Sequence, residues 1–197
     1  GSDVQLGQPL QFSKLIKEKA LNNIIAEESK CYWTNILKLP LQPITFKNGK
    51  IRPNLKTYEG GHLTFSIGKE LKEKLKHFAS SNHSTLFMIL LGTLNILIYR
   101  YTHQKDFVVG VPASTKNSPD FRQTIGLATS VFPVRVPIES DIDFKSYLIK
   151  IRKAVFAIHD YPDFDANAII RELNLGWDQG RASPLFDVIV NMETETT

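Results

Sequence analysis

Residues 85–111 read TLFMILLGTLNILIYRYTHQKDFVVGV and decide the fold class of this protein. The first part, Thr85 to Tyr101, is apolar on nearly every side, which predicts a central helix with Ser84 as its N-cap. The last part, Phe107 to Val111, is a continuous apolar run, which is typical of a strand covered on both faces. A buried helix followed by a buried strand indicates an α/β protein. The leucines expected in one core are Leu86, Leu90, Leu94 and Leu97.

The segments on either side of this stretch also alternate between helical and strand patterns. Periodicity predicts helices at about 10–37, 69–81 and 166–173, and one that is capped by Asp143. It predicts strands at 62–67, 129–136 and 185–192, and a polar loop at 113–123. The whole pattern favours α/β in two layers, a mixed sheet with helices packed on it. The core face of the helix after Asp143 is formed by Phe144, Tyr147, Leu148, Ile151, Val155 and Ile158.

Composition excludes several classes of function. The chain has 197 residues, 42% of them hydrophobic and 22% charged, which is ordinary for a globular protein. Its net charge of +4 comes from lysines that alternate with glutamates, as in 69–74, so we expect no nucleic-acid partner. The longest apolar run, 86–99, is too short to span a bilayer, so we expect no membrane partner. The single cysteine, Cys31, cannot form an internal disulfide, which favours a reducing, cytoplasmic location.

Motif searches predict neither a bound cofactor nor a metal. No glycine-rich phosphate loop, no nucleophile elbow and no histidine pair at metal-ligand spacing is present. One HxxxD pattern runs from His159 to Asp163, but Pro162 interrupts it and no glycine follows. We therefore interpret it as a helix-ending turn rather than as a catalytic motif. Packing or surface roles are expected for the remaining histidines, which are His62, His77, His83 and His103.

Several short motifs occur in a fixed order along nearly the whole chain. Each is weak alone, but together they resemble the C-terminal lobe of a condensation domain from a non-ribosomal peptide synthetase. This family belongs to the chloramphenicol-acetyltransferase-like superfamily, so the resemblance implies one lobe of that architecture. The matching motifs are Pro9-Leu10-Gln11-Phe12, Tyr32-Trp33, Tyr58 to Phe65, Thr85 to Met88, Tyr99-Arg100-Tyr101, Val109 to Pro112, Ile125-Gly126 with Pro133 to Arg135, His159 to Pro162, and Ser183 to Phe186.

The resemblance implies amide-bond formation between carrier-bound aminoacyl or peptidyl thioesters. In the family both substrates arrive on phosphopantetheine arms of carrier proteins, and no cofactor is bound directly. The catalytic signature is HHxxxDG, whose second histidine lies beside the attacking amine. This chain contains no HHxxxDG, so we expect no catalytic residue in it and no activity from it alone. The implied partners are the N-terminal lobe, peptidyl carrier proteins and adjacent synthetase domains.

Four residues are implied, by the resemblance alone, to line the substrate tunnel or the interface between the lobes: Lys116, Asn117, Ser130 and Arg181. Two of them depart from the family pattern. Lys116 stands where the family has an arginine, and lysine lacks the planar fork that binds a carboxylate through two bonds. Ser130 stands where the family has an asparagine. These departures leave open a divergent active domain or an inactive one.

The resemblance also predicts the domain organisation. Residues 1–60 would form a linker helix and an irregular connection after the N-terminal lobe, and residues 61–197 the C-terminal lobe, incomplete at its C-terminus. Two alternatives remain: a non-catalytic recruitment module and a CoA-dependent acyltransferase lobe. We also expect self-association, through an open edge at 185–192 or by exchange of the first helix.

Overall fold

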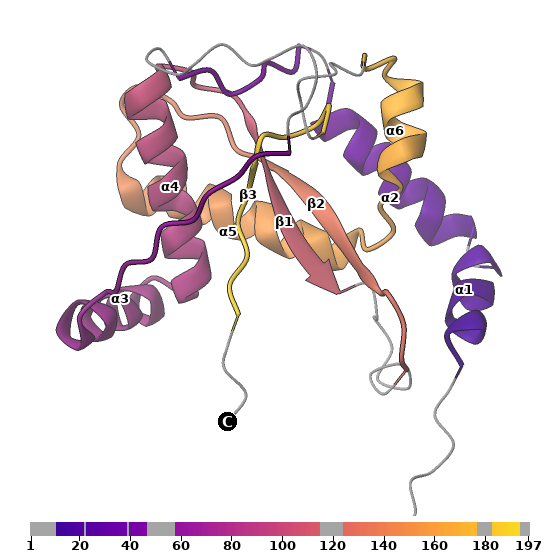
Figure 1. Cartoon of the computed structure of the whole chain (residues 1–197), viewed down its shortest axis with the longest axis horizontal. Coiled ribbons are helices and arrows are strands. Elements are labelled where there is room, and N and C mark those ends of the chain that lie inside the picture. Colours follow the sequence, from indigo (N-terminus) through magenta and orange to yellow (C-terminus); the bar gives the residue numbers. More distant parts are fainter. Residues whose placement is uncertain are drawn as a thin grey trace, which may run out of the picture.

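The computed structural model of this chain describes residues 11–21, 23–38, 40–46, 58–114, 124–176 and 183–193. Helix α5 crosses behind the sheet, α4 stands beside β3, and α2 and α6 lie together on the opposite side (Figure 1). The mixed α/β class is therefore confirmed. The elements are α1 (Phe12–Leu21), α2 (Asn23–Ile36), α3 (Lys69–Ser81), α4 (Leu86–Thr102), β1 (Val108–Ser114), β2 (Thr129–Arg135), α5 (Phe144–Asp160), α6 (Ala166–Glu172) and β3 (Val188–Ile189).

The sheet has the strand order β2-β1-β3 within the described residues. Strands β1 and β2 are antiparallel, and their register runs from Val108 opposite Arg135 to Ser114 opposite Thr129. Strand β3 is parallel to β1, with Val109 opposite Val188. The predicted mixed sheet is confirmed, and β1 is its central strand.

Three sequence expectations about element boundaries were wrong. The helix expected at 10–37 is two helices, α1, which ends at Leu21, and α2, which begins at Asn23, and the residue between them lies outside the described ranges. Residues 62–67 pair with no strand in the described part of the chain, so alternation alone did not make a strand there. The strand expected at 185–192 is paired only at Val188–Ile189. Strand formation needs a neighbour, which a local pattern does not reveal.

The expected core face of α4 was also wrong. Its buried side chains include Met88, Leu91, Asn95 and Ile98, whereas Leu97 is 49% exposed. The leucines at 86, 90 and 94 are only half-buried. Because this helix is apolar all round, composition did not indicate which side faces α5. The N-cap is Thr85, whose hydroxyl accepts a hydrogen bond from the Met88 N–H, and not Ser84.

Helix α5 begins where the sequence predicted. The Asp143 carboxylate accepts hydrogen bonds from the backbone N–H groups of Lys145 and Ser146, which satisfies two helix-start donors. The Ser146 hydroxyl also donates to it, and this bond lowers the pKa of Asp143 most strongly. Tyr147, Leu148, Ile151 and Ile158 are buried as expected, while Phe144 and Val155 are half-buried.

A buried polar contact fixes α4 against α5. The Asn95 amide donates to the Tyr147 hydroxyl at 3.1 Å, and that hydroxyl donates to the Val136 carbonyl at 3.0 Å. Burial raises the pKa of Tyr147 to about 12, so the phenol stays neutral and keeps donating at physiological pH. Gly92 of α4 packs against α5 near Phe144, and a Cβ there would make only an ordinary van der Waals contact, 3.5 Å from that ring.

The Arg135 side chain joins helix α2 to the base of the sheet. Its guanidinium makes two hydrogen bonds with the Asp106 carboxylate, at 2.8 and 2.6 Å. The remaining donors reach the carbonyls of Ile36, Lys38 and Pro40 at and beyond the end of α2. The side chain is 13% exposed. This contact therefore caps α2 and holds it where β1 begins and β2 ends.

An aromatic cluster fills the space between α2, the sheet and α6. Trp33, 1% exposed, contacts the rings of Phe132 and Phe164, and its indole N–H donates to the Tyr161 carbonyl at 2.9 Å. Tyr32 stacks on Tyr161 with a centroid distance of 4.0 Å. The cluster links α2 to the end of α5.

No single helix in the described ranges has the length and apolar composition of a membrane span. Helices α3 and α4 reach that composition only together, and they are bent by 100° at the break between them.

We predict that Arg135→Ala lowers the free energy of unfolding by about 2–4 kcal/mol, because it leaves Asp106 and three carbonyls without their partner. Arg135→Lys should recover less than half of the loss, since lysine lacks the planar guanidinium that binds a carboxylate through two parallel hydrogen bonds. Denaturant titration measures both. The control is Lys150→Ala, which removes an exposed ion pair with Glu139 and should cost under ~1 kcal/mol. Equal losses for Arg135→Ala and Lys150→Ala would contradict the role given to Arg135.

Candidate functional site: the face at the C-terminal end of β1

Ser130 is the only one of the four predicted site residues that the described part of the chain contains. It is the second residue of β2, is half-buried, and lies opposite Ala113 of β1. Side chains directly opposite each other on antiparallel strands project from the same face of the sheet. Lys116, Asn117 and Arg181 lie outside the described residues, so their proposed roles remain predictions.

A pocket of about 210 Å³ opens at the same end of β1. Ala113, the residue opposite Ser130, forms part of its wall, so Ser130 lies beside the pocket at this end of the sheet. The wall is apolar except for His159 and Asn191. The remaining lining residues are Phe87 of α4, Val111 and Pro112 of β1, Val155 and Ile158 of α5, and Val190 and Met192 after β3.

His159 is the residue whose placement the sequence missed. The sequence pattern predicts a helix-ending turn there, and α5 does end at Asp160, with Tyr161 as the C-cap. In the fold, however, this last turn brings the imidazole to the pocket wall. Neither a hydrogen bond nor an ion pair joins His159 to a carboxylate among the described residues. The structure therefore gives it no acid partner of the kind that a catalytic dyad has.

The loop before β2 extends this face with exposed apolar side chains. Ile125 is 87% exposed and Leu127 is 84% exposed. Gly126 between them has φ +154°, and a Cβ there would lie 2.6 Å from the Phe12 ring. Phe12 therefore packs on a site that only glycine leaves open, and this contact holds the start of α1 against the loop.

A second hollow of about 270 Å³ lies between α2, the end of β2 and α5. Tyr32, Trp33 and Ile36 form one side of it, with Lys150 and Lys153 on the other. It adjoins Arg135, at the opposite end of β2 from Ser130, so it is separate from the face described above.

The other histidines and possible metal ligands form no centre in the described ranges. His62, His77, His83 and His103 are all exposed, and no group of three His, Cys, Asp or Glu side chains there could hold a metal ion. Cys31 is exposed and free.

The chain is thus a mixed α/β protein with helices packed on its sheet and a pocket at the end of the central strand. Comparison with known proteins gives the family. The family model described as "Condensation domain" matches residues 1–197. The chain belongs to the condensation-domain family.

The relatives that this chain matches are much longer proteins. The chain is 26% identical over 171 residues to gramicidin S synthase 2 of Brevibacillus brevis, covering 87% of this chain and 4% of that protein. It is similar to the X-domain from teicoplanin biosynthesis, with a TM-score of 0.75 and 20% identity. The match covers 90% of this chain and 39% of that chain. It is also similar to the first condensation domain of the CDA synthetase, with a TM-score of 0.70 and 18% identity. That match covers 91% of this chain and 38% of the other. The chain thus spans a small part of the synthetase and under half of each solved chain.

We predict that Gly110→Ala destabilises the protein by about 1–3 kcal/mol, because overpacking forces side chains and backbone to shift. A Cβ at Gly110 would lie 2.8 Å from the Val131 side chain and 3.0 Å from the Phe186 ring. Phe186 precedes β3, and the residues after β3 form one wall of the pocket. Thermal unfolding of the variant measures the loss. Gly61→Ala is the matched control, since no atom lies within 4 Å of its added Cβ. A melting temperature unchanged by Gly110→Ala would contradict the prediction, because it would mean that strand β1 accommodates the added Cβ without loss of stability.

Proposed function

We propose that this chain is the C-terminal lobe of a condensation domain that forms peptide bonds in non-ribosomal peptide synthesis. The observation that carries the proposal is the family match over residues 1–197, together with the sequence similarity to peptide synthetases. In this assignment residues 1–60 lead from the N-terminal lobe and residues 61–197 form the second lobe. The location would be cytoplasmic, as proposed from the sequence.

The reaction joins two carrier-bound substrates. The acceptor's amine nitrogen attacks the carbonyl carbon of the donor thioester, the C–S bond breaks, and the carrier's thiol leaves with the proton that the amine gives up. A histidine of the HHxxxDG signature assists this step in the family, and residues 1–197 do not contain that signature. The chain's own contribution is therefore positional. Its face at the end of β1 would form one wall of the path along which the phosphopantetheine arms enter.

The apolar character of this face supports the assignment. Ile125 and Leu127 are exposed far beyond what a core-forming side chain normally is, and exposed apolar patches mark interaction surfaces. A second lobe that packs on this loop would bury both. Ser130 and the His159 pocket would then lie at the junction, with Lys116, Asn117 and Arg181 expected nearby. The proposed partners are the N-terminal lobe, carrier proteins and adjacent synthetase domains.

We predict that Ser130→Phe, in the intact domain with both lobes, lowers the rate of amide formation at least ~10-fold, because the added ring would lie beside Ala113, a residue of the pocket wall. The assay follows the product by mass spectrometry, with donor and acceptor loaded on carrier proteins. Thr129→Phe is the matched control, since successive strand residues point to opposite faces and this position is exposed.

Three outcomes are distinguishable in this assay. A selective loss in Ser130→Phe supports the proposed face, and equal rates in both variants remove Ser130 from it. No amide from the unmodified domain, with carrier or partner binding intact, would favour the recruitment module. Acyl transfer from CoA in place of a carrier thioester would favour the acyltransferase alternative.

A further inference from the structure

Residues 40–46, which we call the strap, follow α2 without joining a helix or a strand. The Ile44 side chain is 4% exposed and belongs to the hydrophobic core. No backbone–backbone hydrogen bond joins the strap to another described residue, and Pro40 and Pro43 have no N–H to donate. Side chains of other elements hold it instead, beginning with Arg135, which binds the Pro40 carbonyl at 3.2 Å.

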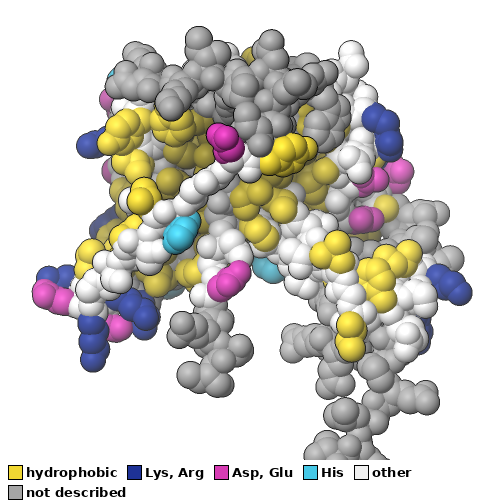
Figure 2. All heavy atoms as spheres, viewed as in Figure 1, with side chains coloured by type: hydrophobic (Ala, Val, Ile, Leu, Met, Phe, Trp, Pro, Cys, Tyr) yellow, Lys and Arg dark blue, Asp and Glu magenta, His cyan; other side chains and the backbone are white. Residues whose placement is uncertain are grey.

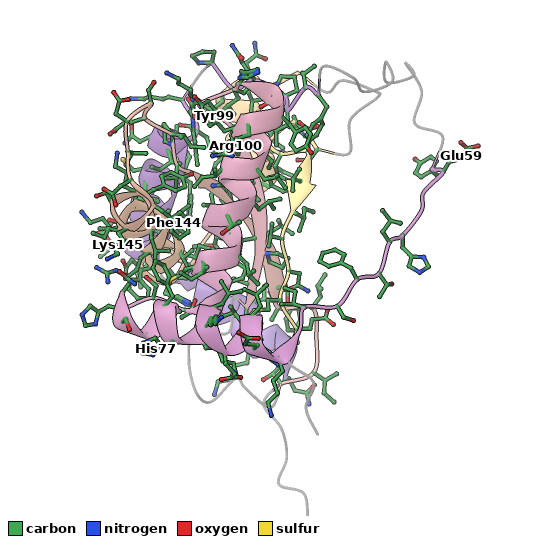
Figure 3. All side chains as sticks on the ribbon, turned by 90° about the vertical axis from the view of Figure 1, so that its left-hand side faces the viewer. Glu59, His77, Tyr99, Arg100, Phe144 and Lys145 are labelled. Atoms are coloured by element: carbon green, nitrogen blue, oxygen red, sulfur yellow. The ribbon has the colours of Figure 1, made fainter. Side chains whose placement is uncertain are left out.

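Gln104, the second residue after α4, binds the strap at two points. Its amide nitrogen donates to the Pro43 carbonyl at 2.8 Å, and its amide oxygen accepts from the Thr45 N–H at 2.8 Å. The Gln104 N–H itself donates to the Thr102 hydroxyl in the last turn of α4. Figure 3 shows Tyr99 near this end of α4, away from α3. The end of α4 thus fixes one side of the strap.

Asp187, the residue immediately before β3, binds the strap as well. Its carboxylate accepts the Ile44 N–H at 2.9 Å. Hydrogen bonds to an ionised acceptor are roughly twice as strong as those between neutral groups. Because Ile44 donates to Asp187 and the next residue, Thr45, donates to Gln104, two successive residues of the strap bind two different elements. The strap therefore joins the end of α4 to the start of β3.

The strand that Asp187 precedes leads directly into a pocket wall. Strand β3 has two residues, and the next N–H, that of Val190, donates to the Gly110 carbonyl of β1 at 2.9 Å. Residues 190–192 then line the pocket of about 210 Å³ at the end of β1. Figure 2 shows hydrophobic side chains beside this part of the chain. Since each backbone hydrogen bond contributes little net free energy, so short a ladder depends on the anchor before it.

We propose that Gln104 and Asp187 are positioning residues which, acting through the strap, set the place of the pocket wall at 190–192. Neither side chain lines the pocket, so both act at a distance. The consequence for binding rests on the proposed function, in which this face forms one wall of the path for the phosphopantetheine arms. A wall that is ordered beforehand lowers the entropy cost of binding. The strap lies within residues 1–60, so the segment assigned to lead from the first lobe also braces this wall.

Amide hydrogen exchange at 188–192, measured by mass spectrometry on the intact domain with both lobes, tests the positioning. Asp187→Ala should speed this exchange at least ~5-fold, because the short ladder opens more often once the strap no longer holds its start. Asp165→Ala is the matched control, since its carboxylate also accepts a backbone N–H, that of Ala168 at 3.0 Å, but at the start of α6. Exchange that is equally slow in the two variants would overturn the proposal.

Gln104→Ala tests whether the strap carries the effect. This variant leaves β3 untouched, so it decides the question even if Asp187→Ala does not fold. We expect it to speed exchange at 188–192 at least ~3-fold, but to add less than ~1.5-fold when Asp187 is already alanine, since the strap then no longer reaches the wall. Gln42→Ala, at an exposed position of the strap, should leave exchange unchanged. An equal effect of Gln104→Ala in both backgrounds would mean that Gln104 acts by another route, which contradicts the role given to the strap.

The kinetics of amide formation connect the wall to binding. In the same domain, Asp187→Ala and Gln104→Ala should raise KM for the carrier-bound substrates at least ~3-fold and change kcat less than ~2-fold, because neither side chain touches the reacting atoms. A lower kcat with an unchanged KM would refute the positioning role. If the unmodified domain forms no amide, the proposed function fails, whereas the exchange measurement still decides whether the strap positions the wall.

Discussion

The guanidinium of Arg135 holds together three parts of the chain that are far apart in sequence. Its hydrogen bonds reach Asp106 before β1 and the carbonyls at the end of α2, while Arg135 itself is the last residue of β2. The last carbonyls of a helix have no partner within the helix, and a cation there also suits the helix dipole. One side chain therefore caps α2 and closes the β1–β2 ladder.

The position of α2 then determines what lies at the end of α5. Trp33 packs between Phe132 and Phe164, and its indole N–H holds the Tyr161 carbonyl at the C-cap of α5. His159 belongs to the last turn of that helix, so its place in the pocket wall depends on the same contacts. The Trp33–Tyr161 hydrogen bond thus holds α2 against the end of the helix that carries His159.

The sequence predicted the elements that bury one face and missed those that depend on a neighbour. The helix after Asp143 was found because its cap and its buried stripe agree. Helix α4 was predicted as well, but its buried side was not. Apolar residues surround this helix, so the sequence does not indicate which side faces the core, and Leu97 is in fact exposed. Alternation at 62–67 predicted a strand, yet a strand exists only where a second one pairs with it.

Ser130 was named from the order of motifs alone, and its role at the candidate site stays a prediction. His159 and Asn191 meet there because α5 and the segment after β3 end beside β1, and no local pattern contains that geometry.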